Sequence, residues 1–471
     1  MTANLLHLSQ PSAWKAVVSE LNKRPVSVGT VRDQVPRSVA PSLKRSRSFN
    51  KYSGGGGARP IASDETGSGS SRDTDIVVEV DIRGLASFVA RTNKSVVLDA
   101  IAEKAAQAPA LFPRPFPLLL SGRNGSITLS QSQIACLLAN AFFGILPKQA
   151  RGLSRNMQHL DFGSLFPAWI TSGPVDAKLA SLFHYFNTIL DRPGPGNKVT
   201  FTRRCLSPGE FPYWRDCDAR VCDIQTFPKG TIEDYDVAHD SGQECLQVDF
   251  ANKLIGGGVL EQGAVQEEIL FTIFPELLAS LFFCEEMKDN ECIFISGPER
   301  FSTYSGYSKT FQWTGEFEDM ACCDPKGRRK REFVAIDASQ FRRGSTDTQF
   351  EESCIMRELN KAYCGFLVSH QSPFESPAPI ATGNWGCGAF NGNGELKALI
   401  QIMAASAARR ELRYFTFNDE ALALKLVRLV EVLQLTGFTV GMLFNVVAGY
   451  RRSSNGESVI DNVMNQASLL L

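Results

Sequence analysis

Short apolar runs that alternate with helical patterns constrain the fold of this chain more than any other feature. Residues 293–295 and 333–336 are apolar at every position, which is typical of strands buried on both faces of a sheet. Helical patterns, such as residues 356–362 and 396–408, separate the strands. This alternation predicts an α/β sheet that carries helices on both faces. The other strands that we predict are residues 199–202, 246–250 and 412–417.

Residues 76–200 have a different, mainly helical pattern. Ser130 and Gln133 form a capping box, which predicts a helix that ends near Pro147. A second apolar stripe over residues 179–190 ends before a Pro-Gly-Pro-Gly sequence. We see no chemistry in this region. We assign residues 76–200 to a helical accessory domain and residues 201–471 to a catalytic α/β domain.

Residues 1–75 have the composition of a disordered basic arm. Their densest charge cluster is Lys44, Arg45 and Arg47. The cluster fits a nuclear localisation signal or a contact with a polyanion, and a solvated charge run that keeps the arm soluble fits it equally well. If the cluster is a localisation signal, it predicts a nuclear protein, and a second population in the cytoplasm is compatible with it.

Composition excludes several classes of function. The formal net charge of −1 over 471 residues argues against a nucleic-acid electrostatic footprint over the whole protein, so any phosphate binding must be local. We expect no direct sequence-specific nucleic-acid binding. No apolar stretch reaches the ~20 residues that span a bilayer, and the N-terminus lacks a signal-peptide pattern. The 12 cysteines and 5 histidines show no zinc-ligand spacing, so we expect no metal and no cofactor.

A glycine-rich segment after the strand at 246–250 is the first candidate site. Asp249 and Asn252 lie near the end of that strand, and Gly256, Gly257 and Gly258 follow. Ligands of open α/β sheets bind outside the carboxyl ends of the strands. Three consecutive glycines allow backbone amides to approach a phosphate or a ribose closely. The segment is therefore typical of a nucleotide-binding rim, although most glycine triplets are plain loops.

Glu267 and Glu268 open the helix that comes next. Glu268 borders the apolar stripe of this helix, so we expect it to be partly desolvated, whereas Glu267 should point further round the axis. Two glutamates in a first turn usually complement the helix dipole. Combined with the strand end and the glycines, however, the pair indicates an active site with one carboxyl protonated near neutral pH.

Two other segments carry candidate ligand contacts. Residues 382–390 form a second glycine-rich turn, which leads into a helix starting near Glu395 and suits a diphosphate. Tyr304 and Tyr307 could stack on adenine or ribose, and a surface or packing role fits them equally well. Phe417, at the end of a predicted strand, is by default a core aromatic.

With these segments assembled, the sequence resembles the poly(ADP-ribose) glycohydrolase family over residues 112–417. The resemblance rests on residues 246–252, on the glycine triplet with Gln266–Glu268, and on residues 358–366 and 381–390. It implies an α/β, macrodomain-like mixed sheet flanked by helices, with an N-terminal helical accessory domain.

The resemblance also implies site residues. The family's catalytic pattern falls on Asp249, Glu267 and Glu268, with Glu268 as the acid/base. The implied substrate contacts are Ile232, Glu233, Asn252, Gly256, Gly257, Gly258, Gln266, Tyr307, Asn384, Trp385, Gly386, Cys387, Gly388, Ala389 and Phe417.

The implied reaction is hydrolysis of the ribose–ribose O-glycosidic bonds of poly(ADP-ribose), carried on ADP-ribosylated proteins, to release ADP-ribose. Glu268 would protonate the leaving oxygen and then activate water. Glu267 and Asn252 would hold ribose hydroxyls, and both glycine loops would bind the diphosphate. We expect a monomer that does not associate with a membrane.

The alternative is a macrodomain reader that binds ADP-ribose without cutting it. The carboxylate pair separates the two hypotheses, because binding alone does not require it. A P-loop nucleotide hydrolase is disfavoured, since neither glycine loop is followed by Gly-Lys-Ser/Thr.

Overall fold

The computed structural model describes most of the chain after residue 94. The described residues are 95–114, 117–146, 156–168, 171–234, 244–342, 347–451 and 456–470. The basic arm expected at residues 1–75, including the cluster at 44–47, lies outside them.

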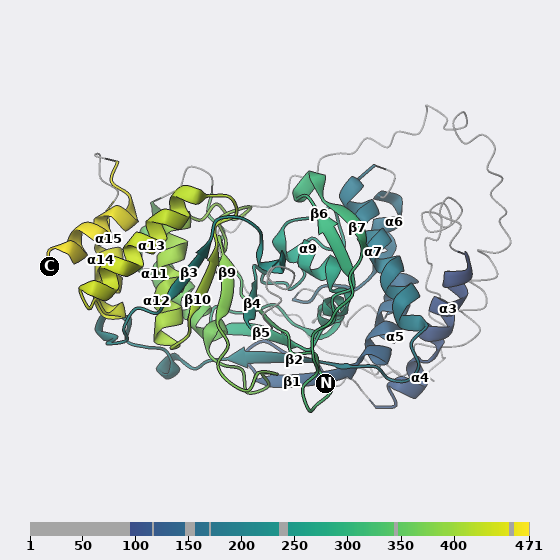
Figure 1. Cartoon of the computed structure of the whole chain (residues 1–471). Helices are drawn as coiled ribbons and strands as arrows, with labels where there is room; N and C mark the ends of the chain where they lie inside the picture. The colour runs from purple at the N-terminus through teal and green to yellow at the C-terminus, as the bar shows by residue number, and fades with distance from the viewer. Residues whose placement is uncertain are drawn as a thin grey trace, which may run out of the picture.

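An eight-stranded mixed sheet forms the centre of the molecule, in the order β1-β2-β5-β8-β4-β9-β10-β3 (Figure 1). Neighbouring strands are antiparallel from β1 to β8 and parallel from β8 to β3. The predicted mixed α/β sheet is confirmed. The strands are β1 Gly125–Ser130, β2 Lys198–Cys205, β3 Ile224–Phe227, β4 Leu246–Asp249, β5 Glu291–Ser296, β8 Glu332–Ala335, β9 Ile380–Gly383 and β10 Leu412–Phe415, with a separate hairpin of β6 Ser302–Ser305 and β7 Gln312–Glu316.

Five of these strands, β2, β4, β5, β8 and β10, coincide with the predicted ones. Strand β1, which no sequence pattern predicted, lies inside the helical region and pairs with β2 along its whole length. Residue 200, the expected domain boundary, falls within β2. The helical region therefore contributes an edge strand to the sheet rather than only packing against it.

Helices cover both faces of the sheet (Figure 1). On one face lie the helical region and the short helices near the glycine triplet; on the other lie α11 to α15, of which α13 to α15 follow the last strand. The helices are α3 Ser95–Ala106, α4 Ala108–Leu111, α5 Gln131–Phe142, α6 Leu165–Ala168, α7 Gly173–Leu190, α9 Gln266–Ile273, α10 Ser280–Phe283, α11 Glu352–Phe366, α12 Gly394–Ala407, α13 Glu420–Leu435, α14 Val440–Gly449 and α15 Val459–Ser468.

Strand β5 shows why the central strands read as continuous apolar runs. Ile293 and Ile295 pack into the core beneath the helical region, while Cys292 and Phe294 pack into the opposite core. Successive side chains of a strand point to opposite faces, so a strand covered on both faces is apolar throughout.

Local signals set the ends of the helices. The predicted capping box is present: the Gln133 amide donates to Ser130 Oγ at 3.2 Å, and the Ser130 amide donates to Gln133 Oε1 at 3.0 Å. Helix α7 ends at Leu190, before the Pro-Gly-Pro-Gly sequence. No helix in the described part of the chain has the length and apolar character needed to cross a membrane.

Candidate active site

A cleft of about 670 Å³ opens at the carboxyl ends of β4, β9 and β10. Almost all of the predicted site residues converge on it, although they span nearly 200 positions of the chain. Those that line the cleft are Ile232, Glu233, Asn252, Gly257, Gly258, Gln266, Glu267, Glu268, Tyr307, Asn384, Trp385, Gly386, Cys387, Gly388, Ala389 and Phe417.

Asp249 and Gly256 are the predicted site residues that do not line the cleft. Asp249 is 1% exposed and lies behind the cleft wall. Burial, together with the nearby Glu268 and Glu233 carboxylates, holds the pKa of Asp249 well above its usual range. Neither carboxyl oxygen accepts a hydrogen bond from any residue that the structure describes. The position favours a protonated supporting group rather than one that touches a ligand.

Backbone amides hold both glutamates of α9. Glu267 accepts from the amides of Asn252 at 2.9 Å and Gly256 at 2.6 Å. Glu268 accepts from the amides of Gly258 at 2.8 Å and Val265 at 2.9 Å.

Both side chains are buried, and Glu267 is 3% exposed against 7% for Glu268. The expectation that Glu267 points away from the desolvated side is therefore wrong, because the glycine loop folds over both carboxylates. Burial and the neighbouring Asp249 and Glu268 carboxylates raise the pKa of Glu267, against the effect of its two amide hydrogen bonds.

The amides of the glycine triplet bind protein groups rather than the predicted diphosphate. Besides the Gly256 and Gly258 amides, the Gly257 amide is also engaged, with the Leu254 carbonyl at 3.2 Å. These amides are therefore not free to bind a diphosphate, so the prediction of a diphosphate contact for this loop is not supported by its hydrogen bonds. They orient the glutamates instead.

Gly257 must lack a side chain for this arrangement to form. Its φ is +49°, and a Cβ would lie 2.5 Å from Glu267 Oε2 and 2.7 Å from Glu268 Oε1. Both contacts are shorter than van der Waals distance, and L-residues avoid this φ. The glycine allows the main chain to approach both carboxylates at once.

The second glycine loop, residues 383–389, keeps three of its amides free, while those of Trp385 and Cys387 donate within the loop. The amides of Gly386, Gly388 and Ala389 donate to no acceptor among the described residues, yet all three residues line the cleft. Asn384 is fixed by donating to the Thr416 carbonyl at 3.0 Å. Free amides grouped on one wall can bind an anion such as a diphosphate.

Trp385 anchors this second loop rather than facing the cleft with its ring. The indole is fully buried and donates to the Ile336 carbonyl at 2.9 Å. Lys397 Nζ lies 4.2 Å from the ring centroid. The prediction of a ligand contact for Trp385 is thus limited to its main chain.

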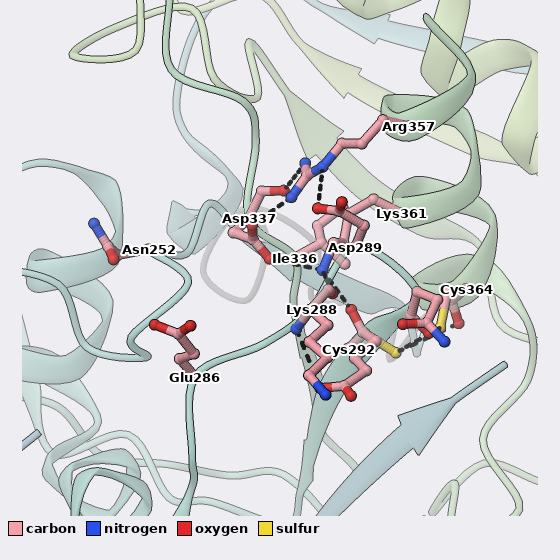
Figure 2. A network of polar contacts seen from close by, with 12 residues as sticks. Asn252, Glu286, Lys288, Asp289, Cys292, Ile336, Asp337, Arg357, Lys361 and Cys364 are labelled. Atoms are coloured by element: carbon pink, nitrogen blue, oxygen red, sulfur yellow. Dashed lines mark hydrogen bonds and ion pairs between the residues drawn. The ribbon is translucent and has the colours of Figure 1, made fainter. Parts of the chain in front are cut away.

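A network of ion pairs fixes the end of β8 beside the cleft (Figure 2). Asp337 pairs with Arg357 at 2.5 Å and with Lys361 at 2.7 Å, and Lys361 also donates to the Glu291 carbonyl at 2.8 Å. Ala338, the next residue after Asp337, lines the cleft. Both cations come from α11, so this helix holds the cleft wall in place, which gives residues 358–366 a structural role.

Two aromatic rings frame the mouth of the cleft. Tyr307 and Phe417 have centroids 5.0 Å apart, tilted by 54°. Phe417 is 46% exposed and is not the core aromatic that its strand position suggests. Its φ of +54° is unusual for a residue with a bulky side chain and turns the ring out of the sheet. An exposed aromatic pair beside free amides fits a nucleobase and its diphosphate.

Gln266 and Glu233 connect the two sides of the cleft floor. Gln266 accepts from the Phe250 amide at 2.8 Å and donates to Glu233 Oε1 at 2.6 Å. Tyr304, one of the two tyrosines considered from the sequence, also lines the cleft, and its hydroxyl lies 3.0 Å from Thr231 Oγ1.

Three side chains that sequence reasoning missed contact the first glycine loop from the helical region: Gln158, Ser164 and Lys178. They lie 80 to 99 positions before their partners, and no local pattern marks them. Among the described residues, no three His, Cys, Asp or Glu side chains gather as metal ligands.

Comparisons with known proteins match both halves of the chain. The family model for poly(ADP-ribose) glycohydrolase, macro domain fold, matches residues 211–424, and the model for the helical domain of the same family matches residues 91–203.

Two curated relatives and one solved structure are similar. Poly(ADP-ribose) glycohydrolase 1 of Arabidopsis thaliana is 35% identical over 402 residues, which cover 71% of each chain. Poly(ADP-ribose) glycohydrolase 1 of Caenorhabditis elegans is 36% identical over 344 residues, covering 70% of this chain and 41% of that protein. The crystal structure of poly(ADP-ribose) glycohydrolase from Deinococcus radiodurans in complex with ADP-ribose is 13% identical at a TM-score of 0.26, over 46% of this chain and 88% of the other.

Proposed function

We propose, since the chain belongs to the poly(ADP-ribose) glycohydrolase family, that it hydrolyses the ribose–ribose O-glycosidic bonds of poly(ADP-ribose) and releases ADP-ribose. One observation carries the proposal. Glu268, held by two amides, lines a cleft whose other wall carries free amides and whose mouth carries two aromatic rings. This arrangement supports an acid that acts next to a bound ADP-ribose.

Glu268 is the proposed acid and base. As the acid it gives its proton to the ribose oxygen that leaves, while the anomeric carbon gains oxocarbenium character. As a carboxylate it then takes a proton from the water whose oxygen bonds to that carbon. The amides of Gly258 and Val265 fix the carboxyl group through both steps, so little reorganisation is needed.

Glu267 has a positioning role in this proposal. Its two oxygens already accept from the amides of Asn252 and Gly256, so it holds the glycine loop rather than a ribose hydroxyl. Asn252 accepts from the Leu254 amide at 3.1 Å, which leaves its side-chain nitrogen to donate to the ribose. The amides of Gly386, Gly388 and Ala389 bind the diphosphate, and Tyr307 with Phe417 contacts the adenine.

The test is incubation of the protein with poly(ADP-ribose) and separation of the products by length. We expect free ADP-ribose to accumulate with the wild type and not with Glu268→Gln, which keeps the shape but has no transferable proton. Tight ADP-ribose binding by calorimetry, without release of ADP-ribose from polymer by the wild type, would contradict the proposal and select a non-hydrolytic reader.

We also propose that the protein acts as a monomer in the nucleus on poly(ADP-ribose) attached to proteins, without sequence-specific nucleic-acid binding. The basic cluster of Lys44, Arg45 and Arg47 supports the nuclear location, and the formal net charge of −1 supports the lack of nucleic-acid binding. Replacing the three cations by alanine in a fluorescent fusion should move the protein to the cytoplasm, and light scattering on the purified chain should give the mass of one copy.

A further inference from the structure

The carbonyl groups of the first glycine loop all point toward donors, and most of those donors belong to the helical region. Between residues 254 and 261, side chains of this region reach seven carbonyl oxygens. The eighth, that of Gly256, accepts from the Val259 amide at 3.0 Å. We call the three donors, Gln158, Ser164 and Lys178, the carbonyl clamp.

Gln158 holds the part of the loop nearest the glutamates. Its side-chain nitrogen lies 3.1 Å from the carbonyl oxygens of both Leu254 and Ile255 and 3.0 Å from that of Gly257. An atom surrounded by three carbonyl oxygens must be the donating nitrogen of the amide. One side chain thus ties three points of the loop together.

Lys178 and Ser164 hold the rest. Lys178, from α7, is 4% exposed and donates to the carbonyls of Val259 at 3.0 Å, Glu261 at 2.9 Å and Gly258 at 3.3 Å. Ser164 donates to the Leu260 carbonyl at 2.6 Å. A buried ammonium group is costly unless its hydrogens are satisfied, so this geometry is tightly specified.

Peptide geometry links the hydrogen bonds of Gln158 to the positions of the two glutamates. In a trans peptide unit the carbonyl and the following N–H point in opposite directions. The unit that joins residues 255 and 256 gives its carbonyl to Gln158 and its N–H to Glu267. The unit that joins residues 257 and 258 gives its carbonyl to Gln158 and its N–H to Glu268.

We propose that Gln158 is a positioning residue for Glu267 and Glu268. Through the carbonyl clamp, the helical domain is then part of the catalytic apparatus. Without the donor at residue 158, both peptide units are free to rotate, and the two amides no longer hold the carboxylates in place. This inference rests on the proposed glycosidase function and assigns the helical region a role in the chemistry rather than in stability alone.

The test compares Gln158→Met with Gln133→Met in the full chain. Gln133 also donates to a backbone carbonyl, that of Leu111 at 3.0 Å, and it belongs to the helical region but not to the cleft. The two variants make the same chemical change, so they separate a general loss of stability from a loss of positioning.

We expect Gln158→Met to lower kcat for ADP-ribose release by about 100-fold, the cost of a small misplacement of a reacting group. Its affinity for ADP-ribose should stay within about threefold of the wild type, because the free amides of the second loop are untouched. Gln133→Met should keep kcat near the wild-type value even where its thermal midpoint falls.

A kcat of Gln158→Met within twofold of the wild type would overturn the inference, as would an equal fall of kcat in both variants. If Gln158→Met does not fold, Lys178→Met tests the same loop and should show the same separation of kcat from affinity. A wild type that releases no ADP-ribose would contradict the proposed function itself, whereas an active wild type with an unaffected Gln158→Met would contradict the inference alone.

Discussion

The two glycine loops that meet at the cleft have similar composition and opposite uses. In the first, residues 254–261, the amides of all three glycines are engaged within the protein, two of them with the glutamates, and seven of the eight carbonyls are engaged with the helical region. In the second, residues 383–389, the amides of three residues that line the cleft have no acceptor among the described residues. A glycine-rich loop can therefore either organise catalytic groups or bind a ligand, and hydrogen-bond partners tell which.

The largest expected effect comes from replacing the acid that the first loop holds. Glu268→Gln should lower ADP-ribose release by about 100- to 10,000-fold, the range in which positioned acid–base groups act. ADP-ribose affinity should change little, because the second loop keeps its amides. Product analysis and calorimetry on the same preparation check the two expectations. Loss of ADP-ribose binding together with activity would contradict the separation of catalysis in the first loop from ligand binding in the second.

The next prediction disturbs the geometry of the first loop without touching a carboxylate. Gly257→Ala places a Cβ 2.5 Å from Glu267 Oε2, so the loop and the glutamates must separate. We expect kcat to fall by about 100-fold through misplacement, with ADP-ribose affinity nearly unchanged. Steady-state kinetics measures this split, and a variant that loses affinity instead would show that the first loop binds the ligand.

The matching change in the second loop is Gly386→Ala. Gly386 has a φ of +74°, and a Cβ there would lie 2.6 Å from the Cβ of Ala338. The loop must shift, which moves the free amides, so we expect ADP-ribose affinity to fall by about tenfold, or 1.4 kcal/mol. The rate at saturating polymer should change less than in Gly257→Ala. A loss of affinity in Gly257→Ala with a loss of kcat in Gly386→Ala would contradict the separate roles of the two loops.

The smallest expected effect concerns the charge that holds the first loop. Burial lowers the pKa of Lys178 to about 8, against the carboxylates of Glu268 and Glu261, which favour the ammonium. Between pH 8 and the unfolded-state pKa near 10.5, the unfolded chain binds more protons, so stability rises with pH.

Relative to Lys178→Met, the wild type should therefore gain about 1 kcal/mol of unfolding free energy between pH 7 and pH 9. Denaturant titrations at the two pH values measure this. An unchanged difference between the two proteins would mean that Lys178 does not titrate in this window.

Much of the fold and of the site could be predicted from local patterns. Apolar runs marked strands buried on both faces, and the strand–glycine–glutamate segment marked the cleft. Strand β3 has apolar residues only at its two ends, β9 runs into the predicted glycine-rich turn at 382–390, and β1 lies directly before a capping box, so none of the three showed a strand pattern.

The use of each glycine loop could not be predicted, because composition does not show which amides are already occupied. Nor could Gln158, whose contacts with the loop join residues up to 99 positions apart through tertiary packing. The turn of Phe417 out of the sheet depends on a positive φ, which sequence gives no reason to expect at a phenylalanine.

The most direct test of the division between the loops is a crystal structure of the protein with ADP-ribose bound. We expect the diphosphate oxygens within 3.2 Å of the amides of Gly386, Gly388 or Ala389, with Gly256 and Gly258 still donating to Glu267 and Glu268. A diphosphate bound to the amides of Gly256 and Gly258, with the glutamates released from them, would contradict the account.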